Sequence, residues 1–257
     1  MARVLVTGSA DGLGQMAARL IVAAKHRVVL HARNSERASE ALEAVPGAET
    51  VVVGDLSSIR ETRDIADQVN GLGPFDAVIH NAGVGYRERQ PGATVDGLPI
   101  VFAVNTLSTY ILTALINRPK RLVYLSSGMH RGGDSSLKDL LWKERPWNGS
   151  SAYADSKLQD VILAFAVARK WKDVLSNALE PGWVPTKMGG PGAPDDLDAG
   201  PKTQVWLATS DEPGARVSGQ YFFHMKRRAA DPSASTESVQ DRLLAECAKI
   251  SGVPFPA

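Results

Sequence analysis

The sequence predicts an α/β fold, in which residues 1–257 form a single domain with a doubly wound parallel sheet and helices on both of its faces. Short apolar runs alternate with segments of helical periodicity along the chain. A glycine-rich turn joins the first apolar run directly to the first helical segment. No internal repeat or low-complexity tract interrupts this alternation, so one domain accounts for the whole chain.

Strands are predicted where apolar residues cluster between turn residues. The first run begins at Arg3, and the glycine-rich turn ends it after Thr7. The seven predicted strands cover residues 3–7, 27–32, 49–56, 75–80, 121–125, 174–179 and 219–224. The basic run 226–228 is too short to indicate a nucleic-acid site, and we interpret it as a solvated surface.

Helices are predicted between these strands, at residues 15–24, 35–44, from about 57, 95–117, 153–170, 202–209 and 235–250. The helix from Tyr153 carries Leu158, Val161, Ile162 and Phe165 at helical spacing, which indicates a face that is buried or that joins a dimer interface. Residues 188–200 are dense in Gly, Pro and Asp and are predicted to form a mobile loop over the site.

Composition limits the possible partners. A net charge of +1, from 29 basic and 28 acidic residues, supports neither a nucleic-acid nor a membrane-surface role. Cys247 is the only cysteine, which excludes an intrachain disulfide and a Cys-rich metal site, so no metal is expected. No apolar run approaches the roughly 18 residues of a membrane span. We expect a cytoplasmic protein without a signal peptide, because a strand begins at Arg3.

The glycine-rich turn has the pattern Thr-Gly-x-x-x-Gly-x-Gly, from Thr7 to Gly14. Glycines let the backbone turn tightly and approach a pyrophosphate closely, and the free N–H groups of the following helix would face that anion. The alternative is a plain loop between a strand and a helix. The position of three glycines directly after a strand favours nucleotide binding, as in Rossmann-like folds.

Tyr153 and Lys157 form a second pattern, Tyr-x-x-x-Lys. Residues four apart on a helix lie on one face, so the ammonium of Lys157 can lie beside the phenol of Tyr153. A nearby cation lowers the pKa of a phenol, which then exchanges a proton with a carbonyl or alcohol more readily. By itself this spacing is also typical of an ordinary surface pair.

Together these motifs resemble the classical short-chain dehydrogenase/reductase family. Further matches are Asp55-Leu56, Asn81-Ala82-Gly83, Asn105, the serine pair Ser126-Ser127 and Pro181-Gly182-x-Val184-x-Thr186. The 25 residues between Ser127 and Tyr153, with His130, Trp142 and Trp147, resemble the retinol dehydrogenase-like and WW-domain oxidoreductase-like branch, as does Ser156-Lys157-Leu158. Residues 128–151 and 183–200 are then expected to be the substrate loops.

The resemblance implies four catalytic residues. Ser127 would orient the substrate oxygen, Tyr153 would exchange the proton, Lys157 would lower the pKa of Tyr153, and Asn105 would hold a water in a proton relay. Two alternatives remain open: Ser126 instead of Ser127, and a purely structural amide at Asn105. Lys157 and an oxidised nicotinamide together would have to supply roughly 4 kcal/mol to bring the phenol pKa from about 10 towards 7.

The resemblance also implies a nicotinamide cofactor, NADP with NAD as the alternative. The second strand ends at Ala32-Arg33, without the carboxylate that would favour NAD, and Arg33 offers a guanidinium to a 2′-phosphate. Asp11 would oppose that phosphate. Asp55 is expected against the adenine or at a helix cap. The residues expected to bind the cofactor are Gly8, Ser9, Asp11, Gly12, Leu13, Gly14, Arg33, Asp55, Leu56, Asn81, Ala82, Gly83, Tyr153, Lys157, Pro181, Gly182, Val184 and Thr186.

The predicted function is hydride transfer between this cofactor and a small carbonyl or alcohol, a hydrophobic aldehyde, ketone or secondary alcohol. Trp147, Trp183 and Met188 are expected to form the wall of an apolar pocket, although tryptophans often only pack loops. His80 is expected in the core, whereas His130 either contacts substrate or fastens a loop. The alternative functions are a nucleotide sensor without turnover and an epimerase or dehydratase. A homo-oligomer is compatible with the sequence.

Overall fold

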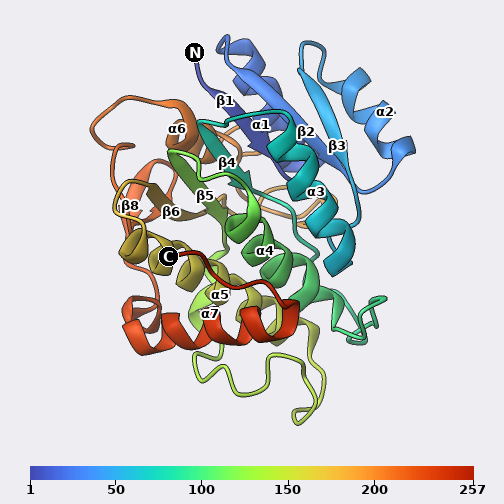
Figure 1. Ribbon diagram of the computed structural model, residues 1–257, viewed down its shortest axis with the longest axis vertical. Coiled ribbons are helices and arrows are strands. Elements are labelled where there is room, and N and C mark those ends of the chain that lie inside the picture. The colour runs from blue at the N-terminus through green and yellow to red at the C-terminus, as the bar shows by residue number, and fades with distance from the viewer.

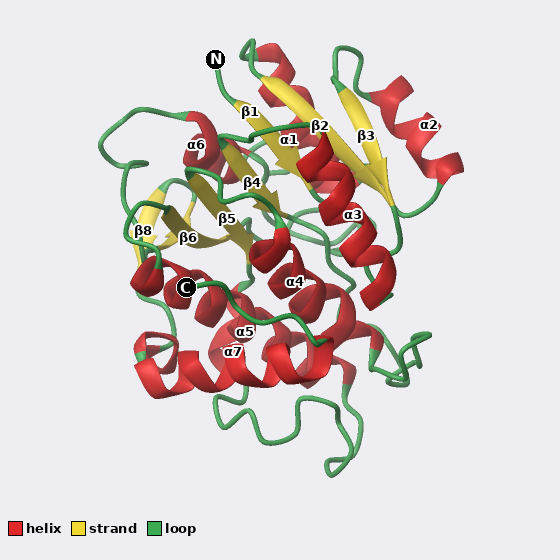
Figure 2. Ribbon diagram, viewed as in Figure 1, coloured by secondary structure: helices red, strands yellow, loops and turns green.

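Eight strands form one sheet in a computed structural model that describes all 257 residues (Figures 1 and 2). Their spatial order is β3-β2-β1-β4-β5-β6-β7-β8, and all neighbours except the last pair are parallel. The chain therefore changes direction across the sheet between β1 and β4, as in a doubly wound fold. The strands are β1 (Arg3–Val6), β2 (Arg27–Ala32), β3 (Thr50–Val53), β4 (Ala77–His80), β5 (Arg121–Leu125), β6 (Leu175–Glu180), β7 (Tyr221–Phe223) and β8 (Lys226–Arg228).

Helices cover both faces of this sheet, which confirms the predicted α/β architecture. They are α1 (Gly12–Ala23), α2 (Ser35–Ala44), α3 (Ile59–Gly71), α4 (Ser108–Leu115), α5 (Gly149–Lys170), α6 (Lys202–Thr209) and α7 (Glu237–Ser251). No helix is both long enough and apolar enough to cross a membrane.

Alternation along the strands divides the core into two layers. In β1, Leu5 joins the larger apolar cluster with residues of α3, α4, α5 and α7. Its neighbours Val4 and Val6 join the smaller cluster with residues of α1, α2 and α6. Successive side chains of a strand point to opposite faces, so one short strand contributes to both layers. All three of these side chains are fully buried, as expected for a central parallel strand.

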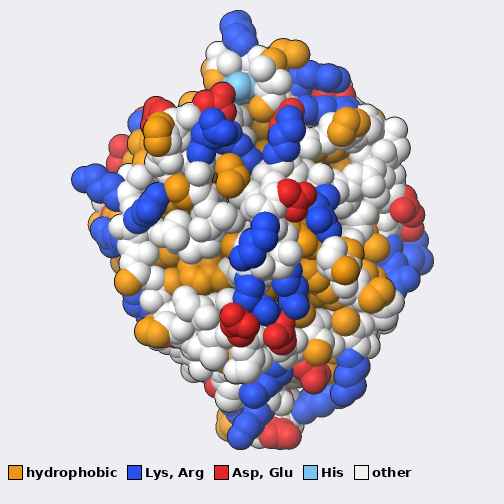
Figure 3. All heavy atoms as spheres, turned by 60° about the vertical axis from the view of Figure 1, so that its left-hand side comes forward, with side chains coloured by type: hydrophobic (Ala, Val, Ile, Leu, Met, Phe, Trp, Pro, Cys, Tyr) orange, Lys and Arg blue, Asp and Glu red, His pale blue; other side chains and the backbone are white.

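The antiparallel strand β8 was not predicted. It pairs with β7 through a two-residue turn, His224 and Met225, both of which have a positive φ, 47° and 61°. Such turns match the twist of a hairpin, but neither residue is one of the types that usually signal them. The side chains of β8 are exposed, as expected for a solvated basic run. The face shown in Figure 3 carries a band of Lys and Arg side chains between hydrophobic areas.

Two helices begin four or more residues away from the predicted start. The helix expected from residue 95 begins only at Ile100, because Gly97 has a φ of 71° and Pro99 restricts the residue before it. A π-helical segment, Phe102–Leu107, follows its first two residues and continues into α4. Helix α5 begins at Gly149, four residues before Tyr153, because the side chain of Asn148 accepts a hydrogen bond from the Ser151 N–H and caps it.

We predict that Trp171→Ala lowers the free energy of unfolding by about 3–5 kcal/mol. Trp171 is 2% exposed, stacks on Phe255 at 5.1 Å between ring centroids, and lies under the guanidinium of Arg118. Chemical denaturation of the variant would measure the change. The control is Trp183→Ala, since that side chain is 55% exposed and should cost less than about 1 kcal/mol. Equal effects at the two positions would contradict this account of the core.

Candidate active site

The glycine-rich turn after β1 depends on very close contacts. Gly8 has a φ of 61°, and a Cβ at that residue would lie 2.8 Å from the Cα of Ala82. A Cβ at Gly14 would lie 2.5 Å from Nδ2 of Asn81 and would also meet the carbonyl oxygen of Gly8. The same Nδ2 donates to the carbonyl oxygens of Thr7 and Gly8. Asn81 therefore connects this turn to the end of β4.

Hydrogen bonds from His31 and Ser9 hold the glycine-rich turn in place. Nδ1 of His31 accepts from the Gly8 N–H at 2.9 Å, so Nε2 carries the proton and donates to the carbonyl oxygen of Gly54. Burial lowers the pKa of His31, in agreement with a neutral ring. Ser9 is fully buried; its hydroxyl donates to Val6 and accepts from the His31 N–H. The side chain of Ser9 thus positions the turn and does not line the cleft.

The N-terminus of α1 is available to an anion. Asp11 stands at its N-cap position, but its side chain makes no capping hydrogen bond. Instead the carboxylate accepts from Arg37 and Lys187, each at 2.9 Å. The negative charge of Asp11, which is expected to oppose a phosphate, is therefore paired with the cations Arg37 and Lys187. Neither cation was among the predicted site residues, because they come from α2 and from the chain after β6.

A cleft of about 670 Å³ crosses the carboxyl ends of the strands. It runs from residues at the ends of β2 and β3, Arg33 and Asp55, to Tyr153 and Lys157 on α5. The other predicted cofactor-binding residues that line it are Gly8, Asp11, Gly12, Leu13, Leu56, Asn81, Ala82, Gly83, Pro181 and Thr186. The close glycine contacts, the uncapped helix and the extended cleft fit a dinucleotide.

Besides Ser9, three predicted cofactor residues do not line the cleft. Gly14 packs against Asn81, Gly182 packs against Asp195, and Val184 is 4% exposed beside Gly200. Asp55 lines the cleft, and its carboxylate accepts from the Ser57 N–H. Ser58, not Asp55, caps α3 by accepting from the Glu61 N–H. No group of His, Cys, Asp and Glu side chains is arranged to hold a metal ion.

Tyr153 is 7% exposed at the inner end of the cleft. Its hydroxyl lies 3.9 Å from the sulfur of Met188, and the ring of Tyr86 packs edge-on against its ring. Burial raises the pKa of Tyr153, while the Lys157 ammonium and the Ser127 hydroxyl act in the opposite direction. In the protein without a bound nucleotide, burial therefore raises the pKa of Tyr153 by more than Lys157 lowers it.

Lys157 is buried beside Tyr153, with its Nζ 5.7 Å from the centroid of the phenol ring. The ammonium donates to the carbonyl oxygen of Leu125 and to Oδ2 of Asp160, each at 2.8 Å. Burial lowers the pKa of Lys157, but the carboxylate of Asp160 and the phenol raise it, and the net direction is upward. Asp160 was not predicted, although its spacing of three residues from Lys157 on a helix signals such a pair.

The two serines after β5 have different positions. Ser126 is 3% exposed, and its hydroxyl donates to the carbonyl oxygen of Lys157 at 2.7 Å. Ser127 is partly exposed, accepts from the Met129 N–H, and lies close enough to Tyr153 to lower the pKa of its phenol. Ser126 lines the cleft and Ser127 is not part of its lining, so the assignment of Ser127 as the residue that faces a substrate oxygen stays a prediction.

Asn105 lies in the π-helical segment and is 1% exposed. Its Oδ1 accepts from the Val84 N–H, and its Nδ2 donates to the Val84 carbonyl oxygen and to the hydroxyl of Ser156. The amide therefore connects the chain after β4 to α5, which is the structural alternative considered for it. π-helical segments often occur at functional sites, so a role in a proton relay stays a prediction.

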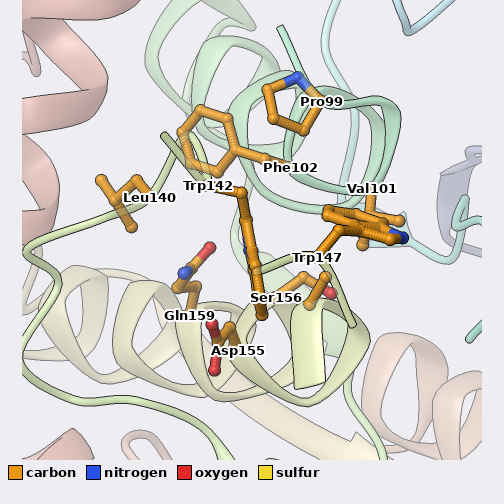
Figure 4. A pocket seen from close by; sticks show the side chains of 10 residues that line it. Pro99, Val101, Phe102, Leu140, Trp142, Trp147, Asp155, Ser156 and Gln159 are labelled. Carbon is orange, nitrogen blue, oxygen red and sulfur yellow. The ribbon is translucent and has the colours of Figure 1, made fainter. Parts of the chain in front are cut away.

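The segment 128–151 packs on α5. His130 is fully buried, with Nδ1 2.7 Å from the Ser127 carbonyl oxygen, and its Nε2 accepts from the Asp231 N–H. This histidine thus fastens a loop and does not face the cleft. Trp147 and Trp142 line a small cavity of about 10 Å³ whose lining also includes residues of α5 (Figure 4). Trp147 therefore packs the loop, whereas Met188 lies directly against Tyr153.

The comparisons with known proteins show the family of this chain. A family model described as short chain dehydrogenase matches residues 2–125. An uncharacterized oxidoreductase of Emericella nidulans is 46% identical over 100% of this chain and 99% of that protein. The chain belongs to the short-chain dehydrogenase/reductase family. Human retinol dehydrogenase 13, which is 32% identical over 99% of this chain and 86% of its own length, supports the retinol dehydrogenase-like branch of the family.

Solved structures share the fold. A Mycobacterium paratuberculosis protein superposes with a TM-score of 0.85 at 24% identity, covering 100% of this chain and 96% of its own. A blue fluorescent protein from a metagenomic library, solved in complex with NADPH, has a TM-score of 0.69 at 17% identity, covering 86% and 95%. These structures show the fold, whereas the sequence relatives show that the protein is a short-chain dehydrogenase/reductase family oxidoreductase.

We predict that Gly14→Ala destabilises the protein by about 1–3 kcal/mol more than Gly12→Ala does. A Cβ at Gly14 would collide with backbone and with Asn81, whereas a Cβ at Gly12 would meet nothing within 4 Å. Gly12 has a φ of 55°, so its substitution still costs roughly 1–2 kcal/mol. Denaturant titration of both variants gives the difference, and a larger loss at Gly12 would contradict the proposed packing.

Proposed function

We propose that this oxidoreductase transfers a hydride between NADP(H) and a hydrophobic aldehyde, ketone or secondary alcohol. The observation that carries the proposal is the pairing of Tyr153 with Lys157 in the lining of a dinucleotide-sized cleft. A phenol with a cation on the same helix face is suited to exchange a proton with a substrate oxygen. The bound nicotinamide would supply or accept the hydride.

Each side chain of this chain would have a separate task. Ser127 would donate a hydrogen bond to the substrate oxygen and orient it. Tyr153 would give its proton to that oxygen during reduction and recover it from the alcohol during oxidation. Lys157 would favour the phenolate and, with its remaining N–H, would hold a ribose hydroxyl. Asn105 would support the water relay, and its contacts with Val84 and Ser156 keep it in place.

Charge at the outer end of the cleft favours NADP over NAD. Arg33 is exposed and lines the cleft where β2 ends, and no carboxylate replaces the neighbouring Ala32. Arg37 also lines the cleft, although it is paired with Asp11 and Glu40. Because Asp11 is paired with Arg37 and Lys187, its repulsion of a 2′-phosphate would be small.

An apolar lining supports a hydrophobic substrate. Val84, Ile100 and Met188 line the cleft, and the sulfur of Met188 lies 3.9 Å from the Tyr153 hydroxyl. Pockets of this kind bind through apolar contact and orient the ligand with a few polar groups. The name of the human relative refers to retinol, which is an apolar alcohol. Turnover with NADPH or NADH against a panel of aldehydes, ketones and alcohols tests this directly, and activity confined to sugars or charged acids would contradict it.

We predict that Tyr153→Phe lowers turnover by at least 10²–10⁴-fold, the contribution typical of general acid–base catalysis. The ring and its packing remain, so nucleotide affinity should hardly change. Tyr86→Phe is the matched control, because it removes a hydroxyl from the ring that packs against Tyr153. Steady-state rates and nucleotide titration of the three proteins measure both effects. A Tyr153→Phe protein that keeps half of its activity would remove Tyr153 from the reaction.

We predict that the protein prefers NADPH to NADH by about tenfold, the lower half of what one charge-assisted contact of roughly 1.5–3 kcal/mol supplies. Arg33→Ala should reduce this preference, and Ala32→Asp combined with Arg33→Ala should reverse it. Arg27→Ala is the control, since Arg27 lies at the opposite end of β2 and pairs with Glu49. Both nucleotides are titrated at fixed ionic strength, and an unchanged preference in Arg33→Ala would exclude Arg33 from the site.

A further inference from the structure

Asp160 and Lys157 form an ion pair inside the core. Their side chains are 4% and 6% exposed, and Oδ2 of Asp160 lies 2.8 Å from Nζ of Lys157. An ammonium has three donors, and two of those of Lys157 point to Asp160 and to the Leu125 carbonyl oxygen. The same Nζ lines the cleft beside Tyr153, so one side chain connects the buried carboxylate to the phenol.

The other titratable groups near this pair are neutral. Tyr124 of β5 faces Asp160, and burial raises the pKa of that phenol. Behind it, Thr113 of α4 joins Tyr124 to His80 of β4, whose pKa burial lowers to about 3. Burial also raises the pKa of Asp160 to about 6, against the pull of Lys157. Above that pH the Lys157 ammonium and the Asp160 carboxylate are the charges that face Tyr153 from inside the core.

Resting on the function proposed above, we propose that Asp160 is a positioning residue that controls the protonation of Tyr153 by holding and neutralising the ammonium of Lys157. Lys157 stabilises a phenolate, whereas the carboxylate three residues further along the helix opposes it. Asp160 also keeps Lys157 protonated, although burial of the side chain opposes the charge. The carboxylate thus retains the phenol proton that carbonyl reduction consumes.

The direction of the effect follows from charge. Replacing Asp160 with Asn removes the negative charge and leaves an uncompensated ammonium beside the phenol. Tyr153 and Lys157 titrate as a coupled pair, and a pair with excess positive charge releases a proton at lower pH. Alcohol oxidation, which needs phenolate, should therefore begin at lower pH, and carbonyl reduction, which needs the phenol, should decline at lower pH.

The test compares Asp160→Asn with Asp155→Asn. Asn keeps the shape of Asp and an oxygen that accepts from Lys157. Asp155 is also a buried carboxylate of α5, but it pairs with Arg145 and accepts from the Asp134 N–H. The first readout is the pH profile of kcat/KM in both directions. The second, which needs neither nucleotide nor turnover, is the phenolate absorbance of each protein minus that of the same protein carrying Tyr153→Phe.

We expect the Tyr153 transition of Asp160→Asn to lie about one pH unit lower than in the unaltered chain, with the rate profiles displaced in the same direction. Asp160→Glu, which restores the charge, should return the transition towards its original position, and Asp155→Asn should not move it. An unmoved transition in Asp160→Asn, or equal shifts in both Asn variants, would overturn the proposal.

If Asp160→Asn fails to fold while Asp155→Asn folds, the role of Asp160 is structural and the proposal is also overturned. Failure of the proposed function has a different signature. A protein without turnover on any carbonyl or alcohol would still show the phenolate shift if Asp160 controls Tyr153. An active protein whose transition does not respond to Asp160 would retain the proposed function and lose this inference.

Discussion

The burial of α5 on nearly its whole circumference is the constraint on which the site depends. Consecutive residues from Ala152 to Ala164 are buried, and many of them are polar or charged. A buried polar group without a partner is costly, so each of these must find one. Asp155 pairs with Arg145, Ser156 accepts from Asn105, and Gln159 accepts from the Thr106 hydroxyl. These contacts hold α5 at a defined rotation and depth.

Because α5 is held in this way, Tyr153 and Lys157 reach the cleft with their orientations already set. The glycine-rich turn on the other side of the cleft is also held rigidly. Asn81, Gly8 and Gly14 leave no space for side chains between the ends of β1 and β4. The cleft therefore lies between two rigid supports, with the less regular segment 183–200 beside it. Preorganised groups of this kind favour catalysis, since they need little rearrangement when charge develops.

Sequence patterns predicted most of the fold because the signals were local. The strand β1, the glycine turn and α1 appear in one stretch of residues, and the parallel sheet follows from the alternation of elements. Where the prediction failed, the deciding feature was a backbone conformation that the residue types do not announce. His224 and Met225 adopt a positive φ in the turn before β8, and Asn148 caps α5 earlier than its apolar pattern indicates.

The sequence by itself determined the fold class, the family to which the chain belongs, and the placement of Tyr153 and Lys157 on one face of a helix. These depend on order and spacing along a single segment. Only the tertiary structure decided what surrounds them: the Leu125 carbonyl oxygen against Lys157, His31 against the glycine turn, and Met188 against the phenol. The reason is physical. The pKa of a buried group depends on the charges and solvent within a few ångströms, and in a folded core most of these come from segments distant in the chain.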